Sequence, residues 1–524
     1  MKRYNLILPK IFFTILVLFL TVTSCDDSFL EPVNENELSP DTFWQSADDA
    51  RKAIIGAYSP LSTVFGWGRM MILHTVYRSD VVDPFAFQGT TTDASNFSIN
   101  PNFGRLIEIW GEFWKTIFRT NLIFENLDNI EDPSFSEEEK STIRGEAHFL
   151  RAFQYFYLIT MFRNVPLLTE PPAGLEEITA APADPAQVWE QIISDLQQAQ
   201  QLLPPSWEAD NVGRATSWAA TALLGKTYLY RAGIEGSSGD YALAAAELKK
   251  VIDSGLFDLV ENYADNFNAA GENNVESIFE IQFDNNGLAW GADNPETLRA
   301  AAWEPDMAPP PFTSQNGFEI NDWAFERFLD TPDNDGNIDI RTYSTFIWNY
   351  PGARIYQDAF AEAYATNLDF VGGRKYLDFE TPDKPQSDFG FAGFPSVINW
   401  RIIRFADVLL MYAEAENEAN GSSAAVLDAL NRVRERANMP TFTLQDQATM
   451  RQIIRDERVL ELSLEGSRYY DLLRWGLIPE RFVDNPEFRE NTGGVFYQPG
   501  REYLPIPQSE IATNPLYPQN PGYI

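Results

Sequence analysis

The hydrophobic residues of this chain recur every three or four positions over much of its length, which is the spacing of amphipathic helices. The same period predicts helices over 136–162, 185–203 and 404–419. The chain is therefore predicted to be mainly helical. The pattern is clear in 105–130, where the apolar residues are Leu106, Ile109, Trp110, Phe113, Ile117 and Leu122.

Two stretches predict antiparallel helix pairs. Residues 214–254 carry a Leu-Gly…Tyr pattern and then an Ala…Leu…Val pattern, which is typical of a tetratricopeptide unit. Residues 404–437 predict a second pair. Because such units bury their apolar faces only against neighbours, we expect a curved α-solenoid. An earlier helix through SADDARKAIIGAY is predicted to start at Ser39-Pro40-Asp41.

Helical periodicity fades in two segments, 66–104 and 256–400, which are rich in Gly, Pro, Asn, Asp and aromatic residues. Loops of this length inside a folded protein are usually functional, so we expect the ligand-binding parts there. We expect residues 37–524 to form a single domain. Its helical scaffold is predicted to cover 37–65, 105–255 and 400–480.

The first 24 residues predict a secretion signal. Lys2 and Arg3 precede an apolar run over 11–22 that is too short to span a bilayer comfortably. The string V-T-S-C ends at Cys25 and resembles a bacterial lipobox, which implies that Cys25 is lipidated and becomes the mature N-terminus. Residues 25–36 would then be a lipidated tether. The alternative is an ordinary signal peptide followed by a free cysteine.

Charge and cysteine content exclude several classes of protein. The formal net charge is −37, and such an acidic surface repels phosphate backbones, so we expect no nucleic-acid partner. Cys25 is the only cysteine among 524 residues. One cysteine excludes a disulfide within the chain, a thiolate metal cluster and a CxxC redox pair.

Catalytic and metal-binding motifs are missing from the sequence. It contains no HExxH, GxSxG or P-loop motif, and of its two histidines His148 lies at helical spacing, as a core or interface histidine does. The stretch 331–339 resembles a calcium loop, but Thr331 and Thr342 occupy positions that need carboxylates. We therefore expect a polar turn there, no bound metal, no cofactor and no enzymatic activity.

Several strings in the chain resemble the SusD/RagB family of Bacteroidetes outer-membrane lipoproteins. They include NRVRERANMP, IIRDERVLELSLEGSRYYDLLRWG, GEAHFLRAFQYFYLITMFRNVPL and the C-terminal LPIPQSEIATNPLYPQNPGY. The second string is the most specific, and its charges are predicted to be structural rather than catalytic. At their helical spacings they can form a network that holds helices and loop together: Arg458, Glu461, Glu465, Arg468 and Asp471.

The resemblance implies a tetratricopeptide-like scaffold that carries a loop-rich ligand-binding half. It implies a non-catalytic, surface-exposed glycan-binding lipoprotein. Its partner would be a SusC-like TonB-dependent transporter, a β-barrel that it covers as a lid. Asp26 and Asp27 resemble the signal that sends such lipoproteins to the cell surface, so we expect attachment to the outer membrane through Cys25.

Aromatic side chains in the loops are the positive signal for a glycan site. A flat ring suits the C–H face of a sugar, and nearby polar side chains can fix the hydroxyls. Phenylalanines stand where the family's starch-binding prototype has tryptophans, which leaves the glycan open. The predicted ligand-binding residues are Trp67, Arg69, Asp80, Phe85, Phe87, Trp290 and Phe318.

Two other functions stay open at this point. The same scaffold could capture peptides or another nutrient, which would favour strand edges and charged pockets over aromatic platforms. A surface glycoside hydrolase is the third alternative, although the carboxylates are too numerous for sequence to single out a catalytic pair.

Overall fold

The computed structural model describes residues 43–84, 90–172, 179–284, 301, 307, 318–356, 358–377, 396–484 and 496–524. Its long helices confirm the predicted, mainly helical fold class. They are α3 (Ala47–Tyr58), α6 (Gly104–Asn126), α7 (Glu137–Phe162), α9 (Pro185–Leu202), α10 (Ser217–Glu235), α11 (Asp240–Asp253), α16 (Phe405–Asn420), α17 (Ala424–Arg436) and α18 (Gln447–Leu462). The shorter helices are α4 (Met70–Thr75), α5 (Thr90–Ser95), α13 (Asp322–Leu329), α14 (Arg341–Thr345), α15 (Phe360–Ala363), α19 (Arg468–Arg474) and α21 (Gln508–Thr513).

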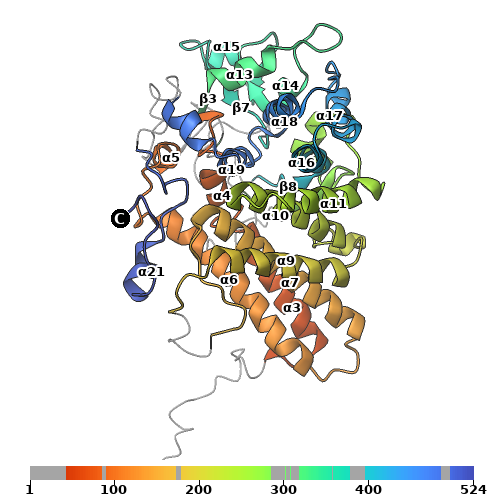
Figure 1. Ribbon diagram of the computed structural model, residues 1–524, viewed down its shortest axis with the longest axis vertical. Helices are drawn as coiled ribbons and strands as arrows, with labels where there is room; N and C mark the ends of the chain where they lie inside the picture. The colour runs from red at the N-terminus through yellow and green to blue at the C-terminus, as the bar shows by residue number, and fades with distance from the viewer. Residues whose placement is uncertain are drawn as a thin grey trace, which may run out of the picture.

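The long helices pack mainly against their neighbours in sequence, as in a solenoid. Contacts run from α6 to α7, α7 to α9, α9 to α10, α10 to α11, α11 to α16, and α16 to α17 and α18. In Figure 1 the helices α3, α6, α7 and α9 fill the lower half, and α10 and α11 cross the middle. The predicted pairs at 214–254 and 404–437 are α10–α11 and α16–α17.

Helix starts follow local capping chemistry. Ser46 caps α3, and its hydroxyl and the Asp49 carboxylate form a reciprocal capping box. The predicted start at Ser39-Pro40-Asp41 is therefore wrong in position, since the Ser46 box begins the helix at Ala47. Residues 39–41 lie outside the described residues.

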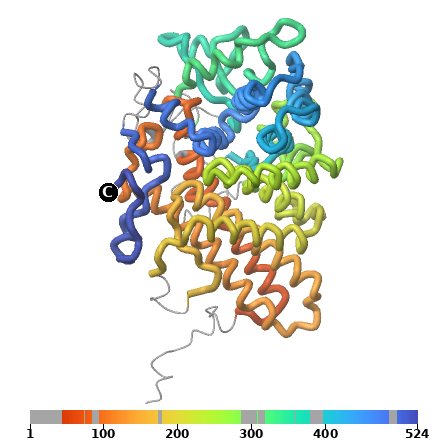
Figure 2. Tube along the Cα trace, viewed as in Figure 1, coloured from red at the N-terminus to blue at the C-terminus, as the bar shows by residue number. Residues whose placement is uncertain are grey.

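The strands form four two-stranded antiparallel ribbons within the described residues. The pair β2–β8 lies between the helices, whereas β3, β7 and α13–α15 form a cap over the scaffold, drawn in green at the top of Figure 2. The strands are β1 (Val82–Pro84), β2 (Ser277–Ile281), β3 (Phe318–Ile320), β4 (Phe346–Ile347), β5 (Arg354–Ile355), β6 (Asp358–Ala359), β7 (Gly372–Gly373) and β8 (Trp400–Arg404).

The core centres on α7, whose second half is buried almost continuously from Phe149 to Phe162. The C-terminal segment is held against the same helix, because the Leu504 N–H donates to the Met161 carbonyl at 2.7 Å and the Tyr517 hydroxyl donates to the Asn164 carbonyl at 2.7 Å. Among the described residues, no helix is both long and apolar enough to cross a membrane.

Candidate functional site

The ribbon formed by β1 and β3 joins the two segments in which the ligand-binding residues were predicted. Its register places Val82 opposite Ile320 and Pro84 opposite Phe318. The Asn321 N–H extends the pairing by donating to the Val81 carbonyl at 2.9 Å. Residues far apart in sequence therefore meet at one edge of the molecule, which we call the β1–β3 edge.

The structure buries four of the seven predicted ligand-binding side chains. Trp67 is 4% exposed, Arg69 2%, Asp80 0% and Phe318 1%. None of these four presents a surface on which a sugar can stack in this structure. Trp67 and Phe318 pack against other rings, and Asp80 forms ion pairs. The other three, Phe85, Phe87 and Trp290, lie outside the described residues and stay predictions.

Trp67 packs into an aromatic cluster in the core. Its ring centroid lies 5.1 Å from that of Tyr157 and 6.2 Å from those of Phe153 and Trp400. Phe318 packs edge-on against Tyr77 at 5.4 Å, and a side chain at Gly373 would collide with its ring. Phe318 thus fixes the base of the β1–β3 edge, whereas Trp67 packs against α7 and β8 in the core.

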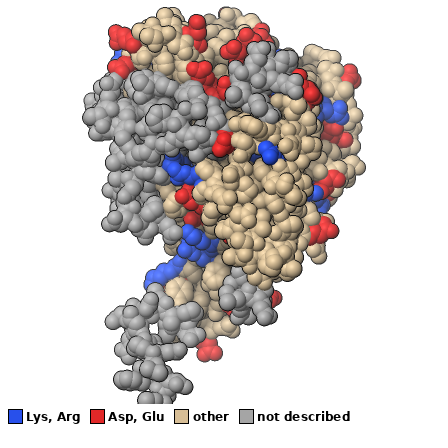
Figure 3. All heavy atoms as spheres, turned by 90° about the vertical axis from the view of Figure 1, so that its left-hand side faces the viewer, with Lys and Arg blue, Asp and Glu red and all other residues tan. Residues whose placement is uncertain are grey.

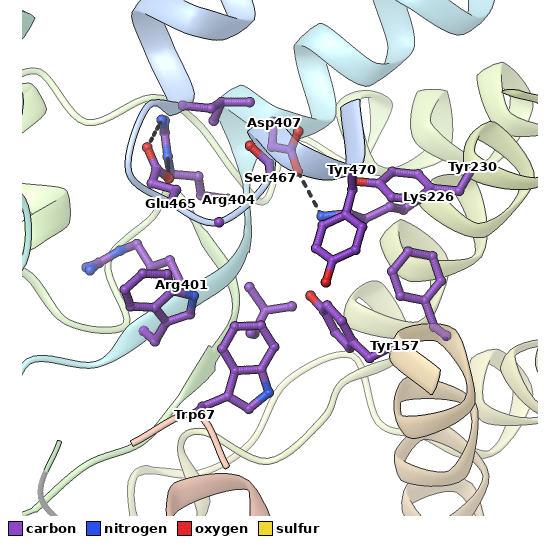
Figure 4. Close-up of a pocket in the computed structure, with 15 residues that line it drawn as sticks. Trp67, Tyr157, Lys226, Tyr230, Arg401, Arg404, Asp407, Glu465, Ser467 and Tyr470 are labelled. Atoms are coloured by element: carbon purple, nitrogen blue, oxygen red, sulfur yellow. Dashed lines mark hydrogen bonds and ion pairs between the residues drawn. The ribbon is translucent and has the colours of Figure 1, made fainter. Parts of the chain in front are cut away.

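The cavity beside Trp67 is too small for a glycan. Its volume accessible to water is about 30 Å³, whereas ligand pockets usually have volumes of roughly 300–1,000 Å³. Figure 4 shows the hydroxyls of Tyr157 and Tyr470 pointing toward one another across it, and Lys226 paired with Asp407. The cavity is therefore an internal gap in the core, and no ligand subsite follows from it.

Asp80 is the charge centre beneath the β1–β3 edge. Its carboxylate accepts hydrogen bonds from Arg468 at 2.8 and 2.9 Å and from Arg481 at 2.7 Å. Its carbonyl accepts from the Trp323 indole N–H at 2.7 Å and from the Asn321 amide at 2.9 Å. Burial alone would raise the pKa of Asp80, but the two guanidiniums outweigh it and lower that pKa. Asp80 thereby joins β1, α13 and the start of α19.

Two carboxylates face each other across the β1–β3 edge, since Asp83 lies directly opposite Glu319. Burial raises the pKa of Asp83 from 3.8 to about 6, and the charge of Glu319 adds to the shift. A carboxyl whose folded-state pKa is raised favours folding most below its unfolded pKa. That stability is lost as the pH rises from about 4 through 6.

Replacement of Asp83 by asparagine is therefore expected to stabilise the protein at neutral pH. Because Asp83 is partly exposed, we expect a gain of only about 0.5–1 kcal/mol at pH 7 and none below pH 4. Melting temperatures from pH 3.5 to 8 test this. Asp428→Asn, on the exposed side of α17, is the matched control and should run parallel to the wild type. A gain for Asp83→Asn that did not change with pH would contradict the account.

The charged residues of the C-terminal motif form the predicted structural network. Glu461 is fully buried and accepts from Arg404 at 2.6 Å, from Arg341 at 3.0 Å and from Arg436. Burial opposes ionisation of Glu461, but the three guanidiniums hold its pKa well below the usual range. The remaining motif pairs are Glu465 with Arg404 and Lys375, Arg458 with Asp407 and Asp471, and Arg468 with Asp80.

His148 and the calcium-like loop take the structural roles predicted for them. The Nδ1 atom of His148 lies 2.7 Å from a carboxylate oxygen of Asp195, which also binds Arg151. Asp333 accepts backbone N–H groups from Asp335 at 2.9 Å and Asn337 at 2.8 Å, which closes a polar turn. Within the described part of the chain, no group of three or more His, Cys, Asp or Glu residues is placed to hold a metal ion.

Sequence reasoning missed two residues at the β1–β3 edge, Trp323 and Arg481. Trp323 is partly buried, and the Arg481 guanidinium lies 4.3 Å from its ring centroid. The signal available was the N-D-W string directly after Phe-Glu-Ile, but aromatic residues are too common in this chain to single it out. Figure 3 shows the side of the molecule that lies at the left of Figure 1, with acidic residues along its upper rim and basic residues lower down.

Comparison with known proteins places this arrangement in a family. The SusD family matches residues 275–523, and the family described as "Starch-binding associating with outer membrane" matches residues 29–229. Together these matches include β1, β3 and the charge network. The chain belongs to the SusD/RagB family.

Relatives of this SusD/RagB chain match it over nearly its whole length. "SusD-like protein P25" of Formosa agariphila is 29% identical, with 94% of each chain covered. The crystal structure of a SusD superfamily protein from Bacteroides vulgatus superposes with a TM-score of 0.77 at 28% identity, covering 92% of this chain and all of that one. A "Laminarin binding SusD-like protein" has a TM-score of 0.71 at 27% identity, covering 91% of this chain and all of that one.

Proposed function

We propose that this SusD-like protein captures a glycan at the β1–β3 edge and delivers it to a SusC-like TonB-dependent transporter. The observation that carries the proposal is the meeting of the two loop-rich segments at β1 and β3, on a base fixed by Asp80 and Phe318. Two comparisons support the same conclusion. One matching family is described as starch-binding, and one solved relative is named as laminarin-binding.

The proposal includes capture without cleavage. The charge clusters of the described residues are closed ion pairs that hold helices together, as the Glu461 network shows. Asp83 and Glu319 lie opposite one another at the β1–β3 edge, and we propose that they shape the edge rather than cleave a substrate. Oligosaccharide incubated with the protein should therefore remain intact.

We further propose that Cys25 carries the lipid anchor and that the protein is exposed at the cell surface. The family's described association with the outer membrane supports this location. Multiple acyl chains on one cysteine hold a protein firmly on a membrane, since each buried CH₂ contributes about 0.8 kcal/mol. The transporter would then lie in the same membrane.

Affinity electrophoresis tests the proposed ligand-contacting residues. Phe85→Ala, Phe87→Ala and Trp290→Ala should each weaken retardation in gels that contain the bound polysaccharide, by roughly tenfold in affinity, because stacking side chains dominate such interfaces. Phe118→Ala is the matched control, since Phe118 is an exposed aromatic residue on α6. Equal retardation of all four variants would show that these predicted residues do not contact the glycan.

A further inference from the structure

We propose that a groove on the helical scaffold is a second binding site, for a neutral saccharide; the ligand class rests on the proposed function. This Trp207 groove is lined by 205–207, 212–214, Thr216, 256–257, 273–275 and 277–280, and measures about 280 Å³. It shares no lining residue with the β1–β3 edge. Its volume is close to the lower limit of roughly 300 Å³ for ligand pockets, which is enough for a short oligosaccharide segment.

Exposed apolar side chains gather around the Trp207 groove. Leu256 is 56% exposed, Val275 49% and Val212 48%, and all three line it. Trp207 and Phe257 also line it, each partly buried. Exposed apolar groups concentrated in one concave place on so acidic a chain indicate a binding surface rather than chance exposure.

The polar wall of the groove is held in place before any ligand arrives. The side-chain amides of Asn273 and Gln282 donate to one another at 3.0 Å in both directions, and the Asn273 N–H donates to the Glu280 carboxylate at 3.1 Å. Asn273 itself has a φ of 51°, a conformation that such contacts must maintain. Gln282 packs over Gly213, whose φ of 94° and lack of a Cβ allow this approach. A prearranged wall lowers the entropic cost of binding.

The charges that line the groove are already neutralised. Its lining contains only two charged residues, Arg214 and Glu280. Arg214 pairs with Glu146 at 2.7 Å and lies 4.2 Å from the Trp207 ring centroid, while Glu280 lies 3.2 Å from Arg401. A charged ligand would therefore find no free counter-charge in the lining.

These features together favour a neutral saccharide over other ligands. A sugar ring presents an apolar C–H face, which suits Trp207 and Leu256. Its hydroxyls suit the exposed amide of Asn273, which keeps one N–H and one oxygen lone pair beyond those bonded to Gln282. An ionic ligand would lose its hydration without gaining a charge partner. A purely apolar ligand would leave the polar wall unmatched.

Hydrogen–deuterium exchange with mass spectrometry tests the Trp207 groove directly. The probes are maltohexaose and laminarihexaose, each added to the protein comprising residues 26–524. We expect the probe that binds to slow exchange in 205–216 and 273–280. Leu256→Glu should abolish this protection and weaken affinity at the groove by roughly tenfold. Leu243→Glu is the matched control, since Leu243 on α11 is 46% exposed and lies outside the groove.

The outcomes distinguish failure of the groove proposal from failure of the proposed function. Protection by an oligosaccharide only in other segments overturns the groove and leaves glycan capture intact. Protection of the groove that persists in Leu256→Glu also overturns the proposal. Binding of neither oligosaccharide, together with protection of the groove by a peptide pool, overturns the saccharide assignment and argues against glycan capture as well.

Discussion

Replacing Glu461 with glutamine is expected to lower the free energy of unfolding by about 3–5 kcal/mol at pH 7. Glu461 is fully buried and neutralises Arg341, Arg404 and Arg436 at once. A glutamine keeps the shape but removes the charge, so buried guanidiniums lose part of their compensation. Denaturant titration followed by circular dichroism measures the loss.

The matched control for Glu461 is Glu139→Gln. Glu139 pairs with Arg51 on the surface, and exposed pairs contribute only about 0–1 kcal/mol. The low pKa of Glu461 gives a second check. The stability that ionised Glu461 contributes is lost only once the pH falls below the ordinary glutamate pKa of 4.5 and toward the lowered folded-state pKa. The difference in unfolding free energy between the wild type and Glu461→Gln should therefore persist from pH 7 to about 4.5. A deficit no larger than that of the control would contradict a structural role for the network.

Replacing Asp80 with asparagine is expected to destabilise the protein by about 3 kcal/mol and to loosen the β1–β3 edge. The substitution leaves the Arg468 guanidinium without the carboxylate that neutralises it, while the carbonyl bonds to Trp323 and Asn321 are kept. Thermal unfolding measures the stability. Hydrogen exchange should rise in 80–84 and 318–323, because both strands rest on this centre.

Asp258→Asn provides the control for Asp80. Asp258 pairs with Arg432, and its side chain is 68% exposed, so its loss should change stability by less than about 1 kcal/mol and leave exchange at the β1–β3 edge unaltered. If Asp80→Asn destabilised the protein while exchange at 80–84 and 318–323 stayed the same, the coupling between Asp80 and the edge would be refuted.

The helices could be predicted because their signals are local. The spacing of apolar residues and caps such as Asp184 before Pro185 determine where a helix lies. Both signals lie within a few residues of one another in the sequence. The start of α3 was misplaced because two capping signals, Ser39 and Ser46, stand close together. The ribbons could not be located in the same way, since the pairing of Pro84 with Phe318 joins residues more than 200 positions apart.

The candidate site was harder to predict because residue type does not reveal burial. Trp67 and Phe318 have the side chains of a sugar platform, yet both lie in the core, where large aromatic residues also belong. Arg458 and Glu461 were interpreted correctly because their helical spacing already indicated a network. The Asp83–Glu319 pair depends on strand register, which no local pattern in the sequence gives.

Calorimetric titration of residues 26–524 with neutral oligosaccharides of several linkages tests the central claim most directly. The account predicts saturable binding of at least one linkage, with the oligosaccharide recovered intact afterwards. Absence of binding across the panel, with saturable binding of a peptide pool instead, would contradict glycan capture by this member of the SusD/RagB family.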